Sequence, residues 1–213
     1  MNIQFICLAN SFKEGGRCIA GIEILDNKLV LVNNTPKWIR PISENDHGEV
    51  NTNLVSHLKL LDIVQINTIK NVPSGYQSEN VLFDTSSIKV VGKFPIASIN
   101  SLNSVNVTTL FGNRTKVVDS TDILHLNYSL ALVELLDFDV FEIKYEGNPN
   151  PKVRLRFTYN NNNYDLPITD ISFLNAYKLN KSILKNSPKI NIVLSLAVVH
   201  EGLYYKLVAG ILF

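Results

Sequence analysis

The sequence has few cysteines, little net charge and no long apolar run. Only two of its 213 residues are cysteines, at positions 7 and 18, which is too few for a disulfide framework. Twenty lysines and arginines stand against nineteen aspartates and glutamates, so no overall field attracts nucleic acid or an anionic membrane from a distance. The most apolar stretches, 192–199 and 203–213, fall short of the roughly 18 residues of a membrane span. We therefore expect a cytoplasmic protein with no membrane partner.

Charge is nevertheless distributed unevenly along the chain. Residues 71–150 carry five basic and nine acidic side chains, whereas residues 151–213 carry eight basic and three acidic ones. A locally basic segment is the first place to look for a surface that binds a polyanion, although most charged segments are solvated faces. With 46% hydrophobic and 18% charged residues, the chain has the composition of a globular protein with one large core or two small ones.

Short runs of isoleucine, valine and aromatic residues dominate the chain, separated by glycine, proline, asparagine or aspartate, and predict strands. We expect strands at 3–8, 18–25, 29–32, 38–42, 62–69, 88–94, 129–136, 140–145, 153–159, 164–168, 190–200 and 205–212. About a dozen strands suit two small barrels better than one. The prediction is a mostly β protein with two tandem barrels, at residues 1–115 and 120–213.

Helical signals are few and short. Residues 53–58, 95–102 and 121–126 each predict one or two turns. A longer helix is expected to follow Thr169 or Asp170, because either side chain can accept a hydrogen bond from the free amides of the first turn. It is expected to run to about residue 178.

A basic hairpin is the clearest local unit. Apolar residues at odd positions of 153–159 alternate with polar ones, which is typical of a strand with one apolar face. The polar face carries Lys152, Arg154 and Arg156, and the asparagines at 160–163 tolerate the left-handed conformation of a turn. We take the three cations as candidate phosphate-binding residues.

A glycine-rich turn lies between the first two predicted strands, in residues 7–18 (CLANSFKEGGRC). Glycines admit positive φ and close approach of a ligand to the backbone, and cations beside them can meet a phosphate. The spacing is not that of a P-loop, and a Gly-Gly hairpin is more often structural. The candidate binding residues here are Asn10, Ser11, Lys13 and Arg17.

The single tryptophan forms a second candidate cluster. Trp38 and Arg40 are two residues apart in a predicted strand, so they share one face. An aromatic ring can stack on a base while a guanidinium holds its phosphate or edge. A place in the core is an equally good interpretation of Trp38.

A polar loop at 75–80 (GYQSEN) follows Pro73. The amides of Gln77 and Asn80 can bind a base edge or a ribose, and the carboxylate of Glu79 can accept two donors. The same side chains can equally tie the loop to a barrel wall, which is the more common role.

Catalytic and metal-binding patterns are weak. Cys7 and Cys18 flank the glycine turn on adjacent predicted strands, but neither His47 nor His57 lies at a usual ligand spacing from them. We expect two reduced thiols and no cofactor. No catalytic motif of the hydrolase, metalloprotease or paired-cysteine type occurs, so the sequence predicts a protein that is not an enzyme.

Taken together, the motifs resemble the dual OB-containing domain of uncharacterised prokaryotic proteins. The segments that carry the resemblance follow in order along nearly the whole chain: 7–21 (CLANSFKEGGRCIAG), 38–43 (WIRPIS) with 48–49 (GE), 61–64 (LDIV), 76–80 (YQSEN) with Asp84, 154–159 (RLRFTY), 164–170 (YDLPITD), 194–196 (LSL) and 205–211 (YKLVAGI). An ordered set of this kind is far more specific than any single motif.

The resemblance implies two OB barrels in tandem, which agrees with the strand count. It also implies a place in bacterial conflict or phage-defence systems, where such domains are suspected of handling nucleic acid. It brings no catalytic residues. The sequence departs from the resemblance at Tyr76, where a histidine is expected before the glutamine of the loop.

The leading functional hypothesis is therefore a non-catalytic module that binds single-stranded DNA or RNA. Such surfaces stack bases on aromatic rings while basic side chains follow the phosphates. A sensor for a nucleotide or modified base, built around the glycine turn and the 75–80 loop, is the second hypothesis. The third is an adaptor that binds a partner effector protein, which requires an exposed apolar patch.

Overall fold

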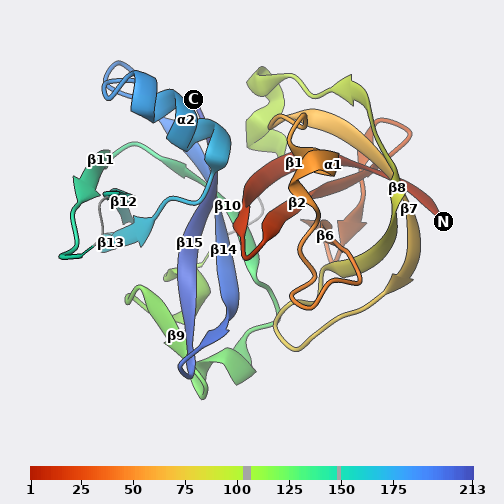
Figure 1. The fold of residues 1–213 in the computed structure, drawn as a ribbon, viewed down its shortest axis with the longest axis horizontal. Helices are drawn as coiled ribbons and strands as arrows, with labels where there is room; N and C mark the ends of the chain where they lie inside the picture. The colour runs from red at the N-terminus through yellow and green to blue at the C-terminus, as the bar shows by residue number, and fades with distance from the viewer. Residues whose placement is uncertain (103–106, 148–149) are drawn as a thin grey trace. The chain divides into compact units, whose positions relative to one another are not determined.

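The computed structural model describes residues 1–102, 107–147 and 150–213 of the chain. The chain forms two compact units, Met1–Ser104 and Val105–Phe213, and strands predominate in both (Figure 1). The predicted mostly β fold class is confirmed. The barrel limits expected at 1–115 and 120–213 stay a prediction. No helix in the described ranges has the length and apolar character of a membrane-spanning one.

The described part of the first unit, residues 1–102, contains eight strands, one short α-helix and one 3-10 helix. They are β1 (Asn2–Lys13), β2 (Gly16–Leu25), β3 (Lys28–Leu29), β4 (Leu31–Val32), β5 (Thr35–Pro36), β6 (Trp38–Ile42), α1 (Thr52–Val55), β7 (Asp62–Asn71), β8 (Asn80–Lys93) and η1 (Ile96–Leu102).

Five of these strands close into a barrel. The order is β1–β7–β8–β6–β2, and β2 pairs back with β1. Every pairing is antiparallel except that of β6 with β8, which is parallel. With α1 between the third and fourth barrel strands, this is the arrangement of an OB barrel.

The first barrel is filled by side chains from all five strands and from the segment around α1. The buried cluster comprises Phe5, Cys7, Ile19, Ile39, Val50, Val55, Leu58, Val64, Ile66, Val81 and Phe83. Strand alternation puts these residues on the inner face, so their neighbours in sequence point outward. The helix and the turn after it therefore contribute Val55 and Leu58 to the barrel core.

In residues 107–147 and 150–213, the second unit contains seven strands, two 3-10 helices and one α-helix. They are η2 (Leu110–Gly112), β9 (Val117–Asp119), η3 (Asp122–His125), β10 (Leu130–Leu135), β11 (Phe138–Ile143), β12 (Lys152–Tyr159), β13 (Asn162–Pro167), α2 (Ile171–Leu179), β14 (Ile190–His200) and β15 (Leu203–Leu212).

The second unit repeats the strand order of the first. β10 and β11 act as one interrupted first strand, because β10 pairs with β14 and β11 pairs with β12. The order then runs β12–β13, and β14–β15 on the other side. A single parallel bridge between Ile168 and Val208 joins the two halves where the third and fifth strands of the first barrel pair. The prediction of two tandem OB-like barrels is therefore confirmed.

Asp170 fixes α2 in the second barrel. Its Oδ1 accepts a hydrogen bond from the amide of Phe173 at 3.1 Å, which caps the first turn. Its Oδ2 accepts one from the amide of Ile211 on β15 at 2.9 Å. The carboxylate is 1% exposed. One side chain thus begins the helix and ties it to the sheet, which directs Phe173 and Tyr177 into the interior.

Candidate functional site

OB barrels bind ligands on the face of their second and third strands and on the adjoining loops. In the first unit these strands are β2 and β6, with the turn between β1 and β2 and the loop between β7 and β8 beside them. In the second unit they are β12 and β13. Ten of the twelve residues predicted as binding residues lie on these elements or at their ends, and the other two, Asn10 and Ser11, lie on β1.

The glycine-rich turn of the first unit has a structural explanation. Gly15 adopts φ +71°, which favours glycine. A Cβ on Gly16 would lie 2.5 Å from the carbonyl oxygen of Val50. The backbones of Arg17 and Val50 exchange two hydrogen bonds of 2.9 Å. Both glycines are therefore required by the hairpin and by the close approach of the 49–50 segment.

Asn10 and Ser11 are buried on β1. The Asn10 side-chain amide donates hydrogen bonds to the carbonyl oxygens of Val55 at 2.8 Å and Leu58 at 3.1 Å. Asn10 therefore holds α1 and the following turn against the barrel, which is a structural task.

Trp38 and Arg40 share the outer face of β6, as the alternation predicts, because Ile39 between them belongs to the barrel core. Trp38 is half-buried, and its indole nitrogen is buried with no hydrogen-bond partner among the described residues. The Arg40 side chain is buried and forms an ion pair of 3.0 Å with Glu79.

Five of the predicted residues lie at or near that ion pair. Gln77, Glu79 and Asn80 are buried, and the Asn80 amide donates to Gln77 Oε1 at 3.2 Å. Burial lowers the pKa of Lys13, and the nearby charge of Arg40 lowers it further. The structure therefore brings Lys13, Arg40, Gln77, Glu79 and Asn80 together as a largely buried polar cluster at the pairing of β6 with β8.

The second unit has an open hollow of about 290 Å³ on the face of β12 and β13, termed here the basic hollow. It is lined by Arg114, Lys116, Ile143, Tyr145, Arg154, Asn163, Tyr164 and Asp165. Three cationic side chains thus face one carboxylate. The lining comes from both barrel strands, from the end of β11 and from the segment before β9.

The three predicted cations of β12 behave differently from one another. Arg154 lies in the basic hollow, where its Nε is paired with Asp165 Oδ1 and its Nη2 donates to the Asp165 carbonyl at 2.7 Å. Lys152 places its Nζ 5.4 Å from the ring centroid of Tyr145. Arg156 is exposed and places its Cζ 4.6 Å from the ring centroid of Phe141. Cations and aromatic rings therefore alternate across the outer face of β11 and β12.

Sequence reasoning missed Arg114, Lys116 and Tyr145 as site residues. The first two fall in 103–122, a stretch without clear periodicity, and only their charge marks them. Tyr145 follows β11 with 45% of its surface exposed. The available signal was its aromatic ring, directly after a strand, β11, that pairs with the basic strand β12.

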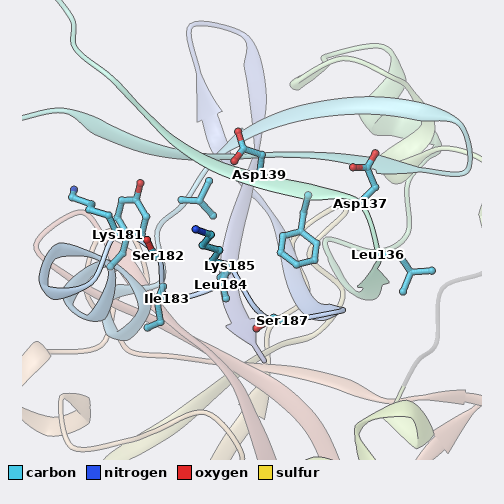
Figure 2. A pocket seen from close by; sticks show the side chains of 12 residues that line it. Leu136, Asp137, Asp139, Lys181, Ser182, Ile183, Leu184, Lys185 and Ser187 are labelled. Carbon is cyan, nitrogen blue, oxygen red and sulfur yellow. The ribbon is translucent and has the colours of Figure 1, made fainter.

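A second hollow of about 390 Å³, the mixed hollow, lies on another part of the same unit. Asp137 and Asp139 line its β11 side, and Lys181, Ser182 and Lys185 come from the turns after α2 (Figure 2). Lys181 is itself paired with Glu142. Two carboxylates against two ammonium groups make this hollow a poor match for a polyanion.

The cysteines do not face one another. Cys7 is opposite Gly21 and Cys18 is opposite Ser11 in the pairing of β1 with β2, and the register shifts between Cys7 and Ala9. Neither cysteine forms a disulfide within the described ranges, and the Cys7 thiol donates to the Ala9 carbonyl oxygen at 3.5 Å. Within the ranges that the structure covers, no three His, Cys, Asp or Glu side chains gather as metal ligands would.

Two solved structures are similar to the chain at low identity. A replication protein A heterotrimer bound to ssDNA matches with a TM-score of 0.35 and 12% identity, over 92% of this chain and 44% of that one. A tetrameric p202 HIN2 matches with a TM-score of 0.30 and 12% identity, over 98% and 87%. The chain thus spans less than half of the replication protein A chain. These similarities are too low to transfer a ligand.

No curated protein matches the chain. The model of the dual OB-containing domain family matches residues 3–211, which is nearly the whole chain and both barrels. The chain therefore belongs to the dual OB-containing domain family.

Proposed function

We propose that the protein is a non-catalytic module that binds single-stranded nucleic acid on the β12–β13 face of its second barrel. The basic hollow carries this proposal. It combines three cationic side chains with an exposed aromatic ring at the face where OB barrels bind oligonucleotides. Its volume, at the lower end for small-molecule pockets, suits one nucleotide of a longer strand.

The side chains around the basic hollow have different roles in the proposed binding. Arg114, Lys116 and Arg154 provide the positive charge that phosphates require. Asp165 engages two of the five N–H donors of Arg154, which fixes the guanidinium plane toward the hollow. Tyr145 presents a ring on which a base can stack. The Lys152 ammonium already lies beside this ring, so a base stacked on the ring lies close to a cation as well.

Fluorescence anisotropy with labelled single-stranded DNA and RNA at low salt tests the proposal. The full chain is expected to bind with a Kd in the micromolar range, and Arg154→Gln is expected to weaken binding about tenfold. Lys185→Gln, which removes an exposed lysine of the mixed hollow, is the matched control and is expected to bind as the wild type does. No binding at tens of micromolar, or equal loss in both variants, would overturn the proposal.

A nucleotide sensor in the first unit is the second candidate. Two buried polar atoms favour it, since the Trp38 indole nitrogen and Asn80 Oδ1 have no hydrogen-bond partner in the described part of the chain. Buried polar groups are normally satisfied, so a donor and an acceptor remain for a ligand. A nucleotide panel in a thermal-shift assay tests this, because a ligand of the folded state raises Tm. A flat response across the panel would exclude it.

The bacterial conflict or phage-defence setting is a further part of the proposal, supported by the resemblance alone. It predicts neighbouring genes that encode effector proteins. A partner effector would supply any catalysis.

A further inference from the structure

Lys206 on β15 is a fully buried lysine that the proposed binding surface does not use directly. Its Nζ donates hydrogen bonds to the carbonyl oxygens of Leu110 at 2.7 Å and Asn113 at 2.8 Å, and to Asn113 Oδ1 at 2.7 Å. An ammonium group has three N–H donors, and three oxygens of one short segment receive them.

The segment that these oxygens belong to is η2 with Asn113. Phe111 adopts φ 51° and ψ 45° and Gly112 adopts φ 79°, so two successive residues are left-handed. A non-glycine residue in this region carries strain and persists where its surroundings impose it. This turn of the backbone directs the oxygens of Leu110 and Asn113 toward the Lys206 ammonium.

Side chains hold the amides of this segment as well. The amide of Leu110 donates to the Tyr164 hydroxyl at 3.0 Å and that of Phe111 to the Tyr128 hydroxyl at 3.2 Å. The Phe111 and Tyr128 rings stack with centroids 5.2 Å apart. Among these contacts, only those of Lys206 are made by a charged group.

The residues directly after the segment line the basic hollow. Arg114 follows Asn113, and Lys116 accepts a backbone hydrogen bond of 3.0 Å from the amide of Lys206 itself. The placement of Arg114 therefore depends on the conformation of 110–113. Lys116 follows two residues later, and its backbone is held in addition by β15, directly before β9 begins.

We infer that Lys206 is a positioning residue of the basic hollow, which holds the 110–113 segment so that Arg114 and Lys116 meet the phosphates of a bound strand. The inference rests on the proposed function, because the binding that it supports is the one proposed for the hollow. It assigns a role to the segment 205–211 (YKLVAGI), whose lysine otherwise lies unexplained in a barrel interior.

The charged and titratable groups around the ammonium are Asp122 of η3, Tyr164 of β13, and Arg114 and Lys116, which follow the 110–113 segment. Burial lowers the pKa of Lys206 to about 8, while the charge of Asp122 opposes this. The Tyr164 ring centroid lies 5.5 Å from Nζ, and burial raises the pKa of its hydroxyl. Phosphates bound nearby favour the charged form of Lys206. By linkage, affinity for a polyanion falls as the pH rises through about 8.

The test compares Lys206→Met with Arg114→Gln/Lys116→Gln in the full chain, with oligo-dT as the probe. Lys206→Met is expected to weaken binding at pH 7 about tenfold, and to reduce the slope of log affinity against log salt toward that of the double variant. The double variant should lose about 1.4 of slope, because each phosphate contact to a single strand contributes about 0.7. Combining all three substitutions should weaken binding little further than the double variant does, since the two sets act through the same contacts.

A pH profile and a ligand-free measurement complete the test. Wild-type affinity is expected to fall more steeply between pH 7 and 9 than that of Lys206→Met, whereas Lys185→Met should follow the wild type. Hydrogen exchange without DNA is expected to show that the amides of Leu110 and Phe111 lose protection in Lys206→Met.

The outcomes separate the two proposals. If the wild type binds no oligonucleotide, the proposed function fails, and unchanged protection at 110–111 in Lys206→Met would overturn the positioning role as well. If the wild type binds and Lys206→Met keeps the wild-type salt slope and protection, only the positioning role is overturned. If the loss of affinity in the triple variant equals the sum of the losses in Lys206→Met and in the double variant, Lys206 acts independently of Arg114 and Lys116.

Discussion

Arg40 and Glu79 form a buried ion pair across the parallel pairing that closes the first barrel. Arg40 Nη2 lies 3.0 Å from Glu79 Oε1, and the two side chains are 3% and 5% exposed. The amide of Arg40 also donates to the carbonyl oxygen of Glu79 at 2.8 Å. Side chain and backbone thus join the strand β6 to the residue that precedes β8. Because burial has removed the water around both charges, each charge depends on the other for its stabilisation.

Glu79→Gln is therefore expected to destabilise the protein strongly, by about 3–5 kcal/mol, since it leaves the Arg40 guanidinium buried without its countercharge. Urea unfolding followed by fluorescence measures this as a lower midpoint. Glu14→Gln is the control, because Glu14 is 75% exposed beside His47 and should cost less than about 1 kcal/mol. Equal losses in the two variants would show that the buried pair contributes no more than a surface pair.

Much of the fold was predictable because its local signals are strong. Alternation placed β12 and the asparagine turn correctly, and the apolar runs of β10, β14 and β15 located those strands to within a few residues. The helix cap was narrowed to Thr169 or Asp170 because capping chemistry is local, and the structure assigns it to Asp170. The first half of β8 was missed, because its apolar run Val81–Phe83 is short and is followed by four polar residues, 84–87. This half pairs with β7 over a bulged register, so tertiary pairing continues the strand through the polar residues.

The candidate site was harder to predict, because the residues of a site come from distant parts of the chain. The cations of β12 were found from their alternation. Their separate roles were not, because Asp165 engages Arg154 while Lys152 and Arg156 lie beside aromatic rings. Lys206 was not identified from the sequence, because it lies in a largely apolar strand. The role proposed for it depends on a left-handed turn at Phe111, which no short-range pattern encodes.

Gly21 is expected to be indispensable for the first barrel. It pairs with Cys7 of β1 and with Ile39 of β6, and a Cβ there would lie 1.9 Å from the Ile6 carbonyl oxygen. Gly21→Ala should cost at least about 3 kcal/mol, the upper end for overpacking, because backbone must move. Gly92→Ala is the control, because the atom nearest to its new Cβ is an Ile63 methyl carbon at 3.4 Å. Its Tm in thermal unfolding should change little. A Gly21→Ala protein with wild-type Tm would contradict the close packing of β1 and β2.

Asp170→Ala is expected to destabilise the second barrel by about 2–4 kcal/mol. It removes the cap of α2, worth about 0.5–2 kcal/mol, and leaves the buried amide of Ile211 without its acceptor, which adds about 1–3 kcal/mol. Thr121→Ala is the matched control, because Thr121 precedes η3 and makes no side-chain cap hydrogen bond. Circular dichroism during urea unfolding should show a lower midpoint for Asp170→Ala only. A cost no larger than that of an ordinary cap would mean that the contact with Ile211 contributes nothing.

The pH dependence of stability provides a check on the burial of Lys206 that needs no ligand. Its pKa is about 8 in the folded chain and returns to about 10.4 on unfolding. Between these values the unfolded chain holds the extra proton, so unfolding takes up a proton and the free energy of unfolding rises with pH. One proton gives at most about 1.4 kcal/mol per pH unit. Urea unfolding from pH 7 to 10 should therefore show the wild type gaining stability relative to Lys206→Met. Lys185→Met, at an exposed position, should keep a constant difference from the wild type. A constant difference for Lys206→Met too would show that the ammonium is as well solvated in the folded protein as in the unfolded chain.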